Sequence, residues 1–357
     1  MSTPHRSPLH DFHLERGGKM VEFAGWEMPV AYGSVKAEHV ATRTSAGLFD
    51  VSHMGRLSFH ADDPVAAVET VFSRKVSDLP VGRCRYGFVT NERGGVLDDV
   101  IVSREDGGVS MVCNASNREK LLAHFADVGI GEVRDHTFDT AMLAVQGPAV
   151  MAKVKELAPT SAGVGSLKRY AFTKFELMGL PVTLARSGYT GEDGVEITVP
   201  AEAAAMVAKA LGVNDDWLTP CGLAARDTLR IEAGMPLYGH ELSEDVTPPE
   251  LNMPFALDAS LTFVGAEALR DSPHPPARQL VGLKLDGKRI ARQDQPVTSD
   301  DTPVGTVTSG TFGPTVDASI AMAFVDTAHA EPGTTLAVDF RGKPVEATVV
   351  PLPFYKR

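Results

Sequence analysis

The sequence has few cysteines, and they form no motif. Cys84, Cys113 and Cys221 are far apart and odd in number, and no CxxC pair occurs. These residues indicate neither a zinc site nor a disulfide framework. We therefore expect no metal centre, and a reducing compartment fits the thiols best.

Long apolar runs are also missing. No stretch reaches the roughly 18–20 apolar residues that a membrane-spanning helix needs. Residues 1–16 are polar and lack the apolar core of a secretory signal. We expect a protein that does not enter the membrane and is cytoplasmic, or that lies in an organelle matrix after processing.

The chain has fewer basic than acidic residues. The chain carries 34 Lys and Arg against 46 Asp and Glu, which gives a formal net charge of −12. General nucleic-acid binding needs basic patches that neutralise phosphates. The composition thus argues against a nucleic-acid partner and says little about small-molecule chemistry.

The chain is long enough for more than one core. Its 357 residues, 43% of them hydrophobic, exceed the size at which single cores stop growing, so two or three domains are expected. Residues 271–276 read as a linker rich in proline. The short strands predicted beyond it, separated by glycine and proline turns, indicate a C-terminal all-β barrel or sandwich. They lie at 280–285, 304–309, 320–325 and 335–340.

The region before the linker mixes helices and strands. Asp63-Pro64 predicts a helix start, and a second helix follows Ser116, with Leu121, Leu122, Phe125 and Val128 inward. Strands are predicted at 85–90, 96–103 and 109–114, with a hairpin turn at 91–95. This part of the chain is therefore expected to be an α+β unit.

Two adjacent carboxylates interrupt the apolar strand predicted at 96–103. Because side chains alternate along a strand, Asp99 points with Leu97 and Ile101, while Asp98 points to the opposite face. A carboxylate on an apolar face is costly unless it is paired or hydrogen-bonded. The acidic pair can therefore be interpreted in two ways that have about equal weight: as part of a functional site, or as structural acceptors of hydrogen bonds.

A loop with three glycines at 187–194 leads into a predicted strand. Glu196 lies between Val195 and Ile197 and so faces away from them. Its carboxylate offers two adjacent acceptor oxygens, which suits a flat heterocycle with neighbouring N–H donors, such as a pterin. A solvated strand face is the alternative and, taken alone, the more frequent one.

A helix predicted over 221–233 and ending at Gly234 carries two arginines on one face. Arg226 and Arg230 are four residues apart. They indicate either an exposed basic face balanced by acidic neighbours or a guanidinium held beside a buried carboxylate. The exposed face is the more frequent of the two.

Several segments, taken in chain order, resemble the signatures of one family. They are residues 7–13, 17–26, 43–54, 90–102, 188–197, 224–234, 305–310 and 353–357. Together they resemble the aminomethyltransferases, the T-proteins of the glycine cleavage system, over nearly the whole chain. The resemblance implies an α+β fold in which three domains form a cloverleaf around a central funnel for folate. The implied domains are 1–54 with 140–245, 55–139 with 246–274, and a β-barrel at 275–357.

The resemblance also implies roles for individual residues. Asp99 is similar to the catalytic aspartate beside the reactive nitrogens of folate, and Glu196 is similar to the carboxylate that grips the pterin. The residues similar to other folate-pocket positions are Met54, Tyr86, Asn114, Tyr189 and Arg226. The chain departs from the family where relatives often carry an aromatic residue or tryptophan, at Ser110 or Met111 and at Phe255.

The implied reaction is the tetrahydrofolate-dependent transfer of an aminomethyl carbon from the lipoyl arm of H-protein. Ammonia is released and methylenetetrahydrofolate forms, with tetrahydrofolate as co-substrate and no metal. A fixed Asp99 carboxylate would stabilise the positive charge that develops on the transferred carbon. Lipoylated H-protein is the expected partner. The candidate docking patch, which is equally a solvated face, comprises Lys288, Arg289 and Arg292 after the linker and Lys356-Arg357 at the end.

Two other functions compete with this one. A folate-dependent demethylase acting on another one-carbon donor would use the same pocket, and no sharp motif marks the donor side. A relative that only binds folate, and supports iron–sulfur enzymes, carries a lysine–glycine–cysteine–tyrosine motif. Residues 263–267 read Phe-Val-Gly-Ala-Glu instead, so the binding-only function is not expected.

Overall fold

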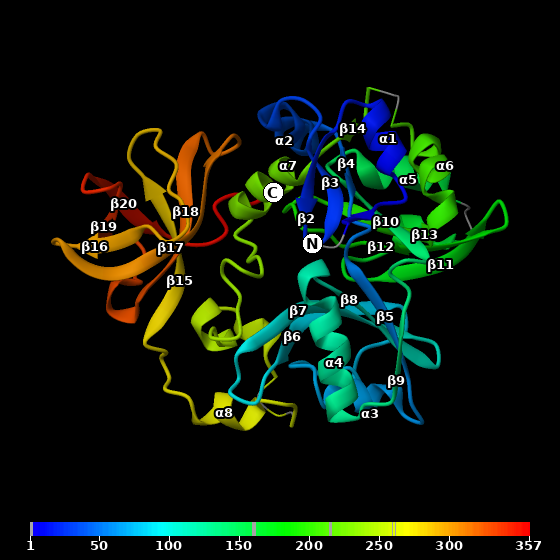
Figure 1. Cartoon of the computed structure of the whole chain (residues 1–357), viewed down its shortest axis with the longest axis horizontal. Coiled ribbons are helices and arrows are strands. Elements are labelled where there is room, and N and C mark those ends of the chain that lie inside the picture. Colours follow the sequence, from blue (N-terminus) through cyan, green and yellow to red (C-terminus); the bar gives the residue numbers. More distant parts are fainter. Residues whose placement is uncertain (1–2, 159–161, 214–215, 259, 261) are drawn as a thin grey trace. The chain divides into compact units, whose positions relative to one another are not determined.

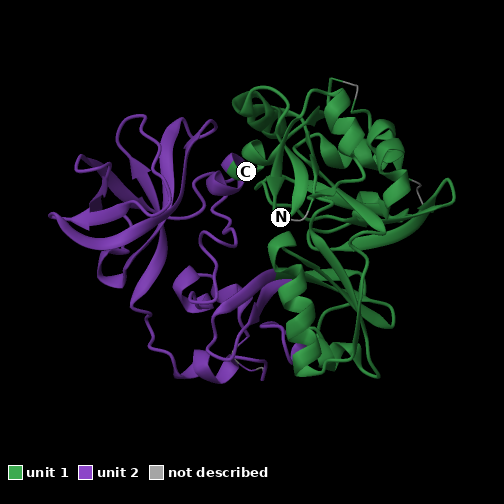
Figure 2. Ribbon diagram, viewed as in Figure 1, with its two compact units in different colours: residues 1–68, 76–85, 100–227 green, residues 69–75, 86–99, 228–357 purple. Residues whose placement is uncertain are grey.

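The structure is a computed structural model that describes residues 3–158, 162–213, 216–258, 260 and 262–357 (Figure 1). The chain divides into two compact units, each assembled from separate segments (Figure 2). Unit 1 comprises residues 1–68, 76–85 and 100–227, and unit 2 comprises residues 69–75, 86–99 and 228–357. The α+β class predicted from the sequence is confirmed, whereas the three domain boundaries stay a prediction.

A six-stranded sheet forms the centre of unit 1. Its strands, in spatial order, are β11 (Phe172–Leu177), β12 (Leu180–Ala185), β13 (Gly194–Pro200), β10 (Thr140–Gln146), β4 (Gly47–Asp50) and β14 (Thr219–Pro220). The inner strand β10 is buried from Ala141 to Gln146, which explains its uninterrupted apolar sequence. Helices α1 (His10–Glu15), α5 (Val150–Leu157) and α6 (Ala204–Ala210) accompany this sheet in the chain, and residues of α5 and α6 share its core.

Two further sheets involve unit 1. The three-stranded one has the order β1 (His5–Arg6), β3 (Trp26–Ala31) and β2 (Lys19–Phe23). The five-stranded one has the order β6 (Arg83–Thr90), β7 (Val96–Glu105), β8 (Gly108–Cys113), β5 (Gly55–His60) and β9 (Glu132–Asp135). Strands β6 and β7 are divided between the units, because residues 86–99 belong to unit 2. The hairpin turn predicted between them is confirmed, with Asn91 N donating to Gly95 O at 2.8 Å.

Three helices begin close to the predicted positions: α3 (Pro64–Glu69), α4 (Arg118–Val128) and α7 (Leu223–Glu232). Helices α2 (Val35–Thr44) and α8 (Ala266–Asp271) were not predicted from the sequence. Asp63 caps α3 as predicted, since its Oδ1 accepts from Val65 N and Ala66 N, each at 3.1 Å. The prediction that Val128 points inward is wrong. This residue is 38% exposed because α4 ends there, one residue before Gly129 in the left-handed conformation.

Unit 2 contains the closed β-barrel that the sequence predicted beyond the linker. Its strands, in spatial order, are β15 (Arg278–Leu285), β18 (Ala318–Asp326), β17 (Thr302–Gly313), β16 (Pro296–Ser299), β19 (Thr335–Asp339) and β20 (Pro344–Val350). One apolar cluster, which includes Leu283, Val307 and Val338, fills the barrel. A second joins barrel residues such as Ile320 and Met322 to Phe88 of β6 and Val96 of β7. The β6–β7 hairpin is therefore part of the core of unit 2.

Candidate functional site

Glu196 lies on the less buried face of β13 in unit 1, as the alternation predicted. Val195, Ile197 and Val199 are buried, whereas Glu196 and Thr198 are half-buried. Ser187 Oγ donates a short hydrogen bond to Glu196 Oε2. The preceding loop thus orients the carboxylate, and the alternative interpretation of a fully solvated strand face is wrong.

The glycine-bearing loop between β12 and β13 is held by ion pairs at both ends. Arg186 donates to both carboxylate oxygens of Asp193, at 2.9 and 2.5 Å. Arg43 of α2 donates to Thr190 O at 2.6 Å and to Glu192 Oε1 at 3.1 Å. These bidentate and charge-assisted bonds fix the path of the loop.

Close packing explains the first glycine of that loop. A Cβ on Gly188 would lie 1.8 Å from Oε1 of the buried Gln146 side chain. Gln146 Oε1 also accepts from Thr190 Oγ1 at 3.1 Å, and its Nε2 donates to Ser187 O at 3.0 Å. No larger residue fits at 188 without displacing the amide that organises the loop.

Arg226 of α7 lies over the ring of Tyr189, with Cζ 4.8 Å from the ring centroid. Burial lowers the pKa of Arg226, and the charges of Glu196 and Tyr189 oppose that shift. The Nη1 atom of Arg226 is buried and has no hydrogen-bond partner among the described residues. A stacked guanidinium that has an unmet donor and lies within the electrostatic range of a carboxylate suits a polar, planar ligand.

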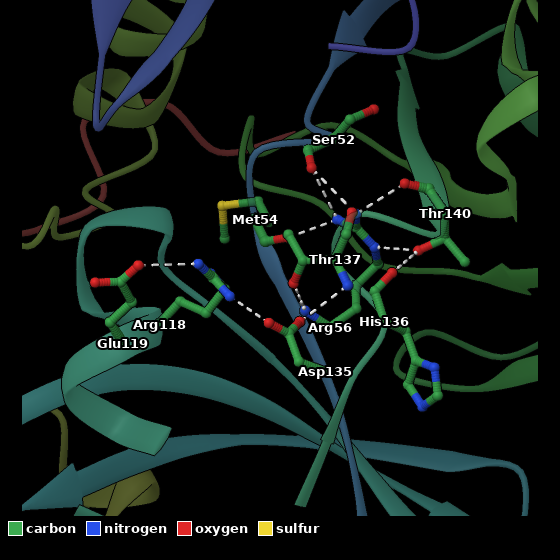
Figure 3. A network of polar contacts seen from close by, with 9 residues as sticks. All are labelled: Ser52, Met54, Arg56, Arg118, Glu119, Asp135, His136, Thr137 and Thr140. Atoms are coloured by element: carbon green, nitrogen blue, oxygen red, sulfur yellow. Dashed lines mark hydrogen bonds and ion pairs between the residues drawn. The ribbon is translucent and has the colours of Figure 1, made fainter. Parts of the chain in front are cut away.

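Met54 is half-buried and follows β4 in a segment fixed by a buried arginine (Figure 3). Arg56 donates to Met54 O at 2.5 Å, to Ser52 O at 3.1 Å, and to Thr140 O and Oγ1 at 3.0 and 2.7 Å. A further short bond joins it to Thr137 O. Burial lowers the pKa of Arg56 to about 10, so the guanidinium stays charged near neutral pH. Met54 is thus presented on a rigid backbone.

Asn114 lies at the end of β8, half-buried, and its backbone begins the short 3₁₀ helix Ala115–Asn117. Ser110, where relatives often carry an aromatic residue, donates to Glu105 Oε1 at 2.7 Å. Met111 is 1% exposed. Neither side chain offers an exposed ring face or a substitute for one at this strand.

Unit 2 holds the two acidic residues of β7. Asp99 is half-buried and accepts from Tyr86 Oη, with Oδ2 at 3.1 Å. Asp98 is 0% exposed, on the face that it shares with the buried Val96. The predicted separation onto opposite faces is confirmed, and Tyr86 and Asp99 are brought together. Phe255, which is 60% exposed, has its ring 6.4 Å from that of Tyr86.

The second arginine of α7 is not on an exposed basic face. Arg230 is 1% exposed and donates to Glu241 Oε2 at 2.8 Å and to Ser309 Oγ at 2.7 Å. Glu232, one of the acidic neighbours expected to balance that face, is also 0% exposed, and its Oε1 accepts from Thr315 N at 2.7 Å. The exposed-face interpretation is therefore wrong, and the alternative of a guanidinium beside a buried carboxylate holds for Arg230.

Sequence reasoning missed a buried polar network in unit 1. Tyr32 Oη lies 2.7 Å from His13 Nδ1, and His13 Nε2 lies 2.8 Å from Asp50 Oδ2. Burial alone would raise the pKa of Asp50, but His13, with Ser52 and Ser7, lowers it to about 2. The partners are 19 and 37 residues apart in sequence, so no local spacing signals the network.

Metal ligands and membrane spans can be assessed over the described part of the chain. Among those residues, no group of three or more His, Cys, Asp or Glu side chains is arranged to hold a metal ion. Within the same residues, none of the helices combines the length and apolar character of a membrane span.

Comparisons with known proteins agree with one another. Residues 9–260 match the family described as GCVT N-terminal domain, and residues 278–356 match Glycine cleavage T-protein C-terminal barrel domain. The aminomethyltransferases of Cutibacterium acnes and Saccharopolyspora erythraea are 44% and 45% identical to this chain, and each alignment covers 100% of both sequences. The solved structure of glycine cleavage system aminomethyltransferase T from Bartonella henselae matches with a TM-score of 0.92 at 33% identity, covering 99% of each chain.

Proposed function

We propose residue roles for this chain, which belongs to the glycine cleavage T-protein family of aminomethyltransferases. It is an enzyme that transfers a one-carbon unit in glycine cleavage, and its family uses tetrahydrofolate. None of the relatives named above is a demethylase, so the alternative donor has no support from them. We assign some side chains to folate binding and others to the transfer of the carbon.

Glu196, Tyr189 and Arg226 bind the folate in this proposal. The observation that carries it is the buried, unmet Nη1 of Arg226, held over Tyr189 in the electrostatic range of Glu196. A buried donor without a partner is costly, and a polar ligand atom would satisfy it. Glu196, oriented by Ser187, would accept from the adjacent N–H groups of a pterin.

Met54 and Asn114 are assigned to the same folate pocket from the family resemblance. Met54 offers a polarizable side chain on a backbone fixed by Arg56, which suits contact with the face of a flat ring. Asn114 offers an amide that can both donate and accept. Both side chains are half-buried and in unit 1.

Asp99 is assigned the electrostatic role in transfer. Tetrahydrofolate, when bound, supplies the nitrogen nucleophile that takes up the one-carbon unit. Positive charge develops on the transferred carbon as ammonia leaves, and a fixed carboxylate stabilises that charge. The hydrogen bond from Tyr86 Oη holds the Asp99 carboxylate in one orientation. Tyr86 therefore positions the acid in addition to any contact with folate.

The donor in this proposal is the lipoyl arm of H-protein, the carrier with which the family works. Lys288, Arg289 and Arg292 of unit 2 are exposed, and Arg289 Cζ lies 5.7 Å from the ring centroid of Phe340. In a chain of net charge −12, these cations are a candidate surface for an acidic carrier.

Ligand binding tests the folate assignment. Tetrahydrofolate should raise the melting temperature of the wild type by mass action, and Glu196→Ala should remove most of that rise. Glu176→Ala is the matched control, because Glu176 is an exposed strand residue of the same unit. An undiminished rise in Glu196→Ala would exclude Glu196 from the site. Transfer from aminomethyl-loaded H-protein, run beside other methyl donors, tests the donor.

A further inference from the structure

His53 has a buried polar atom that the roles above do not use. The residue is 3% exposed, and its Nδ1 has no hydrogen-bond partner among the described residues. Its ring meets Phe23 edge to face, with centroids 5.5 Å apart. Most buried side-chain polar atoms are hydrogen-bonded in folded proteins, so we consider a ligand atom as the partner of this nitrogen.

The charge state of the ring is set by its surroundings. Burial lowers the pKa of His53 to about 4; the charge of Asp50 opposes this shift, and those of Arg226 and Arg56 reinforce it. The imidazole is therefore neutral near pH 7. Its interaction with Arg226 also indicates that the two side chains lie within electrostatic range. Each of them has one buried nitrogen without a partner among the described residues.

The backbone around His53 is fixed, so the unmet nitrogen is not the result of a loose segment. Asp50 Oδ1 accepts from Ser52 N at 2.9 Å, on one side of His53. Arg56 binds the carbonyl oxygens of Ser52 and Met54, on both sides (Figure 3). The backbone is thus held on both sides of His53 while one side-chain nitrogen is left unmet, a pattern typical of a preorganised ligand contact.

We propose that His53 is a folate-binding residue, whose neutral imidazole forms a hydrogen bond through Nδ1 with a polar atom of the bound folate, beside the one met by Arg226. This inference rests on the proposed folate site in unit 1. A neutral imidazole nitrogen donates or accepts according to its tautomer, so it complements the obligate donor Arg226. The pair would recognise a ligand edge that presents both kinds of polar atom, as a pterin does.

Three variants of His53 test this inference through tetrahydrofolate affinity. His53→Leu removes both ring nitrogens, and we expect the Kd to rise about tenfold, the loss of one hydrogen bond. His53→Asn places an amide atom near the position of Nδ1, whereas His53→Gln places it near Nε2. We expect Asn to retain affinity within about threefold and Gln to behave as Leu. This contrast holds even if His53→Leu fails to fold.

His124 provides the matched control. Its Nε2 is also buried without a partner among the described residues, but it lies on α4 beside Phe125, and the charge that acts on it is that of Asp127 rather than those that act on His53. His124→Leu should leave the Kd unchanged. A second readout is the ¹⁵N signal of the His53 ring, which should move when tetrahydrofolate is added, while that of His124 should not.

The outcomes separate this inference from the folate assignment. If the wild type binds tetrahydrofolate but the His53 variants bind it equally well, the inference on His53 is overturned alone. Equal affinity of the Asn and Gln variants, or a stationary His53 ring signal, would overturn it too. If the wild type does not bind tetrahydrofolate, both the folate site and the role of His53 are overturned.

Discussion

Replacing Asp99 by asparagine isolates the charge of one carboxylate. Asparagine keeps the shape of the side chain and can still accept from Tyr86 Oη, which lies 3.1 Å from Oδ2 in the wild type. The variant therefore removes the negative charge with little change in packing. Any large effect on transfer must come mainly from the lost interaction with developing positive charge.

The size of that interaction depends on the environment of Asp99. A unit charge about 4 Å from a developing positive charge is worth about 4 kcal/mol near a protein surface. Asp99 is half-buried, so solvent screens part of this interaction. We expect the transfer rate to fall about 10²–10³-fold, which is the effect of losing one preorganised electrostatic group. Folate affinity should change much less, since the interaction strengthens as charge develops.

Single-turnover transfer from aminomethyl-loaded H-protein, together with the tetrahydrofolate Kd, measures both effects. Asp98→Asn is the control, because Asp98 is 0% exposed on the opposite face of β7. It should lower the melting temperature by a few degrees while the folded fraction stays active. A nearly normal rate in Asp99→Asn, or a catalytic loss confined to Asp98→Asn, would refute the assignment.

Three other perturbations should have measurable effects. Arg56→Leu should destabilise unit 1 by roughly 3 kcal/mol or more, seen as a lower melting temperature, because several buried carbonyls lose their donor; an unchanged value would contradict this. The folded pKa of His53, about 4, lies below the ordinary 6.5, so protonation of this ring disfavours the folded state. The contribution of the neutral ring to the free energy of unfolding is fully present above pH 6.5. As the pH falls toward 4 the protein loses that contribution, about 3 kcal/mol. Wild type should thus lose more stability than His53→Asn between pH 7 and pH 4.5 in urea unfolding. Charge reversal at Lys288 and Arg289 should weaken H-protein binding and its salt dependence, and a salt-insensitive affinity would exclude this patch.

Local chemistry predicted much of the fold. Asp63-Pro64 fixed the start of α3, and the glycine and proline turns beyond residue 276 indicated the barrel. Alternation along β7 separated Asp98 from Asp99, and alternation along β13 placed Glu196 opposite its apolar neighbours. These features depend on a period of two or on a single cap, which one sequence displays directly.

The missed features all depend on partners that are distant in the chain. Arg230 looked like part of an exposed face because its partners lie outside the helix: Glu241 follows 11 residues later and Ser309 of β17 follows 79 residues later. The clamp of Arg56 on Thr140 spans 84 residues. No nucleophile motif surrounds Ser52-His53, and only burial reveals the unmet nitrogen of His53. Long-range pairing of this kind leaves no periodic trace in a single sequence.

The make-up of unit 2 has a consequence for how the chain folds during synthesis. Phe88 and Val96 emerge from the ribosome early, yet their apolar cluster includes Leu280, Ile320 and Phe324. Residues such as Ile231 and Leu242 can cover part of the hairpin earlier, but β18 is added more than two hundred residues after Val96, so the burial of the hairpin stays incomplete until then. A product that stops before β15 would lack the part of this cluster that the barrel supplies, and we expect such fragments to aggregate or to be degraded. Strands β15 and β18 of the barrel thus complete the burial of a segment made in the first third of translation.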